Sequence, residues 1–184
     1  FSFWFYMNNA KNIIKNLSTE EANELASIEL DEALNQMQNL VKSDFLNFVR
    51  YMWPEFIEGD HHRLIGEKFN ALASGKINRL IVNMPPRHTK SEFASYLLPA
   101  WMIGRNPAYK IIQATHTADL AIDFGRKTKN LVDEQMYGEM FNTRLQEDSK
   151  AAGKWKTEQG GEYFAAGVGG AITGRGADLL IIDD

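Results

Sequence analysis

The stretch Arg79-Leu-Ile-Val-Asn-Met-Pro-Pro-Arg-His-Thr-Lys-Ser91 decides how this chain is interpreted. Its apolar first half, Leu80–Met84, predicts a buried strand, and two prolines then open a loop that carries basic and hydroxyl side chains. A helix is predicted from Ser91 to about Met102, kinked or ended by Pro99. A strand that passes through such a loop into a helix is typical of a phosphate-binding site, because backbone N–H groups at the helix start point at the anion.

The loop matches only part of the Gly-x-x-x-x-Gly-Lys-Ser/Thr pattern of nucleotide-binding loops. Lys90 and Ser91 occupy the last two positions, where a lysine neutralises phosphate oxygens and a hydroxyl holds Mg²⁺. Met84 and Thr89 replace both glycines, and a threonine in left-handed backbone is strained. We therefore expect Pro85-Pro86 to shape the loop by another route. The loop alone leaves an ordinary strand-to-helix connection open.

The final residues, Leu179-Leu-Ile-Ile-Asp-Asp184, supply the second half of such a site about 90 residues further on. A buried strand that ends in carboxylates at the carboxyl edge of a sheet is where a bound metal needs another anchor. Asp183 is expected to hold Mg²⁺, through water, and Asp184 to orient and polarise the attacking water. Two solvated acids in an edge loop are the alternative. Together the two segments predict a nucleotide hydrolase.

Arginine is expected to supply the remaining positive charge, because phosphoryl transfer spreads negative charge over the γ-phosphoryl oxygens. Arg87 lies inside the loop and could act in cis. Arg175, flanked by Gly174 and Gly176, could reach the nucleotide of a neighbouring subunit, or could be a surface turn residue.

The composition fits one globular domain, with 184 residues, 44% hydrophobic and 24% charged. The absence of cysteine excludes disulfides and thiolate metal sites. A net charge of −4 argues against a protein that coats nucleic acid by charge alone. Residues 1–60 carry ten acidic and four basic side chains and form an acidic leader. No run of about 20 apolar residues predicts a membrane span, and the position of the last strand predicts that the chain is a fragment.

Periodic patterns place the elements along the chain. Helices are predicted at 18–41, after the capping box Ser18-Thr-Glu-Glu21, at 44–52, and from His61 to near Gly75. A strand at 109–115 precedes a helix capped by Thr117, and residues 155–158 and 162–165 predict a β-hairpin. The alternation of strands and helices predicts a right-handed parallel α/β sheet. We divide the chain into a helical leader at 1–44 and a partial ATPase domain at 45–184.

Three segments together resemble the large subunit of the tailed-bacteriophage terminase, the ATP-driven motor that packages DNA into a procapsid. They are 79–91, Ile111-Ile-Gln-Ala-Thr-His116 and the glycine-rich run 169–184, and the likeness extends from about residue 45 to the end. The resemblance implies an α/β fold with a parallel-sheet P-loop NTPase core of the RecA/ASCE type, incomplete at its C-terminus. A nuclease domain is expected beyond Asp184.

The resemblance also implies roles for single residues. It places a deviant Walker A at Pro85–Ser91, a Walker B at Asp183 and the catalytic carboxylate at Asp184. The expected nucleotide-binding residues are Pro86, Arg87, His88, Thr89, Lys90 and Ser91, with His61 and His62 near the adenine. Arg175 resembles the trans-acting finger, Ser91 and Asp183 are the expected Mg²⁺ ligands, and ATP is the nucleotide. Many members have glycine where Thr89 stands and glutamate where Asp184 stands.

The partners implied are double-stranded DNA, a portal protein, a small terminase subunit and further copies of the chain in a ring. The implied location is the host-cell cytoplasm, transiently on the procapsid. Another NTPase of this class, such as a helicase-like ATPase, is the rival enzyme. A catalytically inactive nucleotide-binding module is the alternative outside enzymes.

Overall fold

The computed structural model describes residues 19–170 and 172–183, so Asp184 and Ser18 of the predicted capping box lie outside it. The chain divides into two compact units, Phe1–Asn39 and Leu40–Asp184. Helix α2 (Thr19–Ser43) corresponds to the helix predicted at 18–41. The remaining elements belong to the second unit, which contains the core and the candidate site.

The helices of the second unit begin and end largely where local signals place them. They are α3 (Phe45–Met52), α4 (Asp60–Ala73), the π-helix η2 (Glu92–Leu97), α5 (Leu98–Arg105), α6 (Ala118–Val132) and α7 (Gln135–Met140). Asp44 caps α3 by accepting a hydrogen bond from the Asn47 N–H at 2.9 Å, and Thr117 caps α6. Pro99 lies in the first turn of α5, where the missing N–H costs no hydrogen bond, so the predicted change of helix occurs there.

Aromatic side chains bind these helices into one core. The ring of Phe45 contacts Phe69, Phe93 and Trp101 at centroid distances of 5.0, 5.3 and 5.5 Å. All four side chains are buried, and the indole N–H of Trp101 donates to the Val41 carbonyl at 3.0 Å. Because Phe93 belongs to η2, the helix that follows the loop is anchored in the middle of this core.

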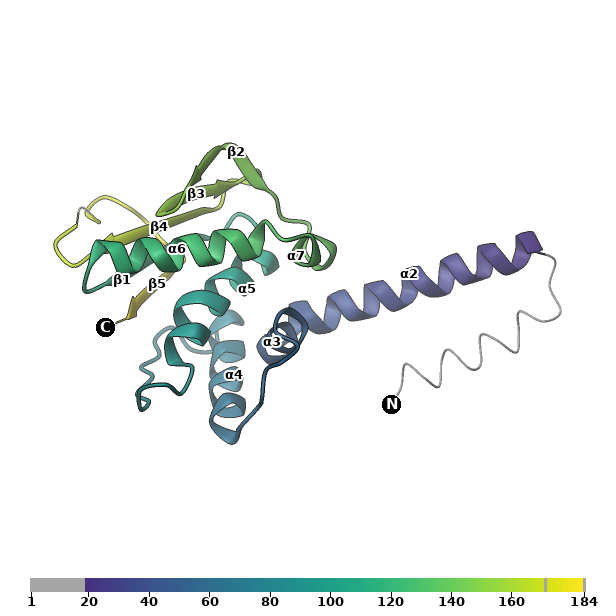
Figure 1. Cartoon of the computed structure of the whole chain (residues 1–184), viewed down its shortest axis with the longest axis horizontal. Helices are drawn as coiled ribbons and strands as arrows, with labels where there is room; N and C mark the ends of the chain where they lie inside the picture. The colour runs from purple at the N-terminus through teal and green to yellow at the C-terminus, as the bar shows by residue number, and fades with distance from the viewer. Residues whose placement is uncertain (1–18, 171, 184) are drawn as a thin grey trace. The chain divides into compact units, whose positions relative to one another are not determined.

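The sheet is mixed rather than parallel. Its strands are β1 (Lys110–Thr115), β2 (Leu145–Ala151), β3 (Lys154–Thr157), β4 (Glu162–Gly167) and β5 (Leu179–Asp183). Their order is β2-β3-β4-β1-β5 (Figure 1). β1 pairs in parallel with β4 and β5, whereas β2–β3 and β3–β4 are antiparallel. The prediction of a parallel-sheet P-loop NTPase core of the RecA/ASCE type is therefore wrong for this structure.

The strand predicted at Leu80–Met84 is also absent from the described structure. Residues 79–85 have no regular secondary structure, and the side chain of Ile81 is 86% exposed. A strand needs a partner for its backbone hydrogen bonds, and β5, which stands last in the sheet order, pairs with β1 alone among the described strands. The apolar run of this segment was thus insufficient to define a strand.

The three parallel strands bring distant segments to a common edge. In the register of the sheet, Thr115 lies opposite Gly167 on one side and Asp183 on the other. Leu179, Ile181 and Asp183 point toward the helical core and are buried, while Leu180 and Ile182 point away from it and are 55% and 76% exposed. This alternation aims the Asp183 carboxylate at η2 and the end of the loop.

Candidate phosphate-binding site

The loop that precedes η2 has the backbone of an anion-binding turn. Residues 86–89 form turns and bends, and helical structure starts at Lys90. Arg87 and Thr89 have φ values of 65° and 63°, in the left-handed region. Left-handed residues within such a turn bring successive N–H groups toward a common point, as in phosphate-binding nests. Thr89 therefore adopts the strained conformation that we expected the two prolines to avoid.

A lysine and a carboxylate from the two predicted segments meet beside this turn. Lys90 Nζ lies 3.2 Å from Asp183 Oδ1, although the residues are far apart in sequence. The Asp183 side chain is 7% exposed, whereas that of Lys90 is 32% exposed. The lysine side chain is therefore partly accessible to solvent, whereas the carboxylate is buried.

Ser95 is a further member of the site that the sequence analysis missed. Its hydroxyl, which is fully buried, donates to Asp183 Oδ2 at 2.8 Å. The residue lies four positions after Ser91 and within η2, so helical spacing from Ser91 was the available signal. π-helical turns often occur at functional sites, because they reposition side chains relative to a regular helix.

The surroundings of Asp183 favour its ionised form. Burial alone would raise the pKa of this carboxyl, but hydrogen bonds from Ser91, Ser95 and Lys90, together with the lysine charge, hold the pKa below its ordinary value. Asp183 is consequently a carboxylate at neutral pH, as a metal ligand must be.

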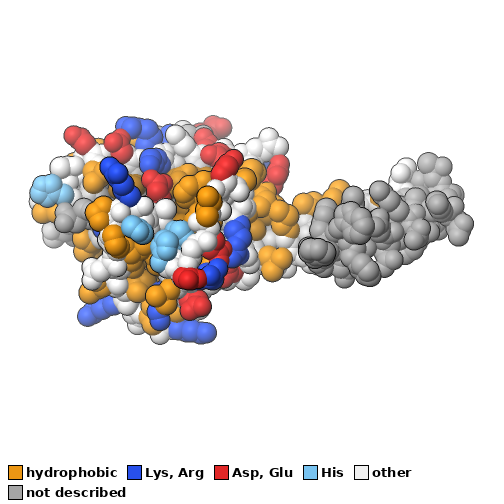
Figure 2. Space-filling view, turned by 60° about the horizontal axis from the view of Figure 1, so that its bottom comes forward, with side chains coloured by type: hydrophobic (Ala, Val, Ile, Leu, Met, Phe, Trp, Pro, Cys, Tyr) orange, Lys and Arg blue, Asp and Glu red, His pale blue; other side chains and the backbone are white. Residues whose placement is uncertain are grey.

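The histidines of α4 lie against the loop. His62 is 5% exposed, and its Nε2 lies 2.7 Å from Thr89 Oγ1. The ring of His61 contacts His62 and His88 at centroid distances of 3.8 and 5.8 Å, and Figure 2 shows histidine side chains gathered on the surface of the molecule. His88 is exposed, and its Nδ1 lies 2.9 Å from the Pro86 carbonyl oxygen.

The two candidate arginines lie in different places. Arg87 is exposed within the turn itself. Arg175 forms an ion pair with Glu162 at 2.9 Å and stacks over Phe164 at 3.9 Å. Glu162 lies opposite Lys110, at the other end of β1 from Thr115, so about five strand residues or roughly 16 Å separate it from the level of Asp183. The fold does not bring Arg175 to the Lys90 of its own chain.

The donors near Lys90 fit Mg²⁺ in part. No cluster of three or more His, Cys, Asp or Glu side chains that could hold a metal occurs among the described residues. Mg²⁺ usually takes one or two protein oxygens and completes its shell with water and phosphate oxygens, so the Asp183 carboxylate and the Ser91 hydroxyl suit it. Asp184, the predicted catalytic carboxylate, lies outside the described residues.

Comparisons with protein-family models, curated proteins and solved structures found no match. Among the helices of the described residues, none has the length and apolar character needed to cross a membrane.

Proposed function

We propose that this chain binds Mg²⁺-ATP at residues 86–91 and hydrolyses it. The observation that carries the proposal is the 3.2 Å contact between Lys90 Nζ and Asp183 Oδ1 beside a turn with two left-handed residues. A phosphate site needs a cation, backbone N–H donors and an ionised carboxylate for the metal, and Lys90, the turn with two left-handed residues and Asp183 are the candidates for these parts.

Each group has a part in this proposal. The Lys90 ammonium neutralises phosphate oxygens, and the N–H groups of the turn donate to the same anion. Ser91 and Asp183 hold Mg²⁺, which when bound neutralises developing charge on the phosphates. Ser95 keeps the Asp183 carboxylate in place. Asp184 remains our candidate for orienting the attacking water.

We further propose that the ATPase is the motor subunit of a viral terminase, which moves double-stranded DNA into a procapsid in the host cytoplasm. The resemblance of 79–91, 111–116 and 169–184 to that family supports this assignment. A portal protein, a small terminase subunit and a ring of identical subunits are the partners that the assignment implies. Nuclease activity would belong to a further domain.

The test is ATP turnover by the full-length protein with Mg²⁺. Lys90→Ala and Asp184→Ala are each expected to reduce turnover by at least about 100-fold, since each removes a group that acts on the reacting phosphate or its water. Unchanged turnover in both variants would refute the catalytic assignment. Lys68→Ala, an exposed change on α4, is the matched control and should leave turnover unchanged.

Arg175 needs a separate experiment because its proposed action is on a neighbouring subunit. When Arg175→Ala subunits are mixed with wild type, the ATP turnover of the ring should fall by a larger fraction than the fraction of variant subunits added. Arg87→Ala tests the alternative finger within the same chain. ATP binding without turnover in the wild-type protein would instead support the inactive nucleotide-binding module.

A further inference from the structure

We propose that His62 is a positioning residue that holds the phosphate-binding turn in shape through its hydrogen bond to Thr89. The inference rests on the proposed function and assigns His62 a place behind the turn instead of against the adenine. It is carried by the contacts of the His62 ring, which connect the start of α4 with the strained residue of the loop.

The hydrogen bonds define which nitrogen of His62 carries the proton. The Gly59 backbone N–H, which can only donate, lies 2.9 Å from Nδ1, so Nδ1 accepts. In the neutral ring Nε2 therefore bears the hydrogen and donates to Thr89 Oγ1 at 2.7 Å. The Thr89 hydroxyl in turn donates to the His88 carbonyl at 2.6 Å. Both ring nitrogens are engaged within the chain, which leaves neither for a nucleotide base.

The position of the ring is fixed from all sides. Phe56 and Phe93 contact it at centroid distances of 4.8 and 5.0 Å. His62 is the third residue of α4, and its bond to the Gly59 N–H takes the part that glutamate or glutamine plays in a capping box. The His62 ring is thus held at the start of α4 by this hydrogen bond.

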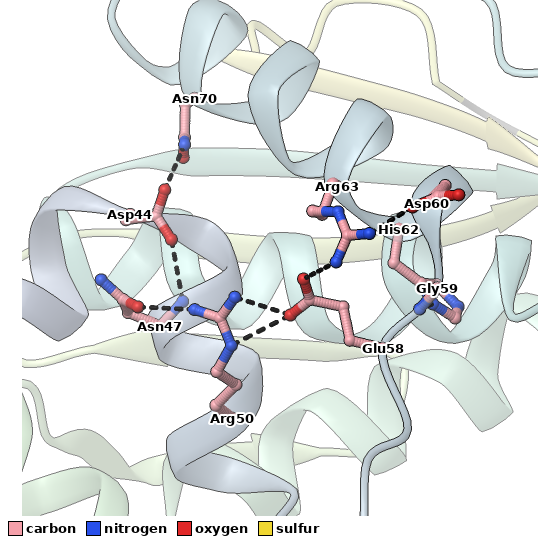
Figure 3. Close-up of polar contacts among 9 residues, drawn as sticks. All are labelled: Asp44, Asn47, Arg50, Glu58, Gly59, Asp60, His62, Arg63 and Asn70. Atoms are coloured by element: carbon pink, nitrogen blue, oxygen red, sulfur yellow. Dashed lines mark hydrogen bonds and ion pairs between the residues drawn. The ribbon is translucent and has the colours of Figure 1, made fainter. Parts of the chain in front are cut away.

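Polar contacts surround the start of α4 (Figure 3). Glu58 accepts hydrogen bonds from Arg50 at 2.6 Å and from Arg63 at 3.1 Å, and Arg63 also pairs with Asp60. Figure 3 shows the His62 side chain beside Gly59, next to the contacts of Glu58 and Arg63. The segment from 58 to 62 is thus linked to α3 and α4 by side-chain contacts, and it carries the His62 donor that reaches the loop.

Thr89 is where the loop needs such support. Its φ of 63° is unfavourable for a β-branched residue and costs free energy that the surroundings must offset. The next residue, Lys90, carries the cation of the site. A turn that relaxed at Thr89 would therefore move both the converging N–H groups and the Lys90 ammonium.

The experiment measures binding of Mg²⁺-ADP to the complete chain by calorimetry. His62→Ala should weaken binding by about tenfold, whereas His62→Gln, whose amide can still donate to Thr89, should stay within about threefold of wild type. In a Thr89→Gly background, where glycine adopts the left-handed backbone without strain, His62→Ala should cost less than about threefold. Lys68→Ala on the same helix is the control.

Hydrogen–deuterium exchange of the peptide spanning 85–91, without nucleotide, gives a readout independent of binding. Exchange should be faster in His62→Ala and close to wild type in His62→Gln. If wild type does not bind Mg²⁺-ADP, the proposed function fails, and exchange alone decides the role of His62. Unchanged exchange in His62→Ala would overturn the proposal. Where wild type does bind Mg²⁺-ADP, an affinity of His62→Ala equal to that of wild type would overturn it as well.

A second pair of variants covers the case in which His62→Ala does not fold. Thr89→Ser keeps the hydroxyl that accepts from His62, and Thr89→Ala removes it, while both leave the buried ring in place. We expect faster exchange of the peptide 85–91 and weaker Mg²⁺-ADP binding in Thr89→Ala than in Thr89→Ser. Equal behaviour of the two would contradict it.

Discussion

At the scale of single residues, the site is organised around one buried carboxylate. Asp183 receives the Lys90 ammonium on one oxygen and the Ser95 hydroxyl on the other. Lys90, Ser91 and Asp183 could be predicted from the sequence, because a lysine-hydroxyl pair after a loop and an acid at the end of a strand are local patterns. Ser95 and the contact of His62 with Thr89 could not, because they depend on how helices pack in space.

Ser95→Ala tests the arrangement at this scale. Loss of a donor to a buried carboxylate should lower the free energy of unfolding by about 1–3 kcal/mol at pH 7, measured by urea denaturation. Ser74→Ala removes an exposed hydroxyl that bonds only the Ala71 carbonyl among its described contacts, and should change stability by less than about 0.5 kcal/mol.

The pH dependence of the stability of Ser95→Ala tests whether its effect acts through the Asp183 carboxylate. The pKa of Asp183 is lowered on folding, so its stabilising contribution is present above the unfolded pKa of about 3.9 and is lost as pH falls through the folded value. The stability difference between wild type and Ser95→Ala should therefore shrink below about pH 4. A difference that is absent at pH 7 would show that the Ser95 hydroxyl does not support the carboxylate.

At the scale of elements, the helices and the β3–β4 hairpin were predicted well, whereas the sheet was not. Helix starts such as Asp44 and Thr117 are encoded by nearby residues. Strand pairing depends on distant segments: β2 and α7 had no clear pattern, and the hairpin itself already places an antiparallel pair in the sheet. The alternation of strands and helices was therefore too coarse a guide to strand direction.

Two glycine substitutions test the packing of α6 on the sheet. A Cβ at Gly125, within α6, would lie 2.5 Å from the Ala152 carbonyl oxygen, so Gly125→Ala should destabilise the chain by about 1–3 kcal/mol. A Cβ at Gly138, within α7, meets nothing within 4 Å, so Gly138→Ala should be neutral or stabilise by up to about 1 kcal/mol. Thermal unfolding compares them, and equal effects would contradict the close approach of α6.

At the scale of the whole molecule, a mixed sheet still brings the two predicted halves of a phosphate site together. The parallel arrangement of β4, β1 and β5 is enough to do this, since it places the end of β5 beside the helix that follows the loop. The contact between Lys90 and Asp183 was therefore easier to anticipate than the architecture, because it joins two short segments and requires only one strand to lie correctly.

The most direct test of the central claim is equilibrium binding of ADP to the complete chain, with Mg²⁺ and with excess chelator. We predict Mg²⁺-dependent binding by wild type and affinity at least about tenfold weaker in Lys90→Met and in Asp183→Asn. The double variant Lys90→Met/Asp183→Asn leaves no unpaired buried charge. Its thermal unfolding shows whether the loss of ADP affinity occurs without a loss of stability. ADP affinity that is unchanged by both single substitutions, or no binding by wild type, would contradict the account.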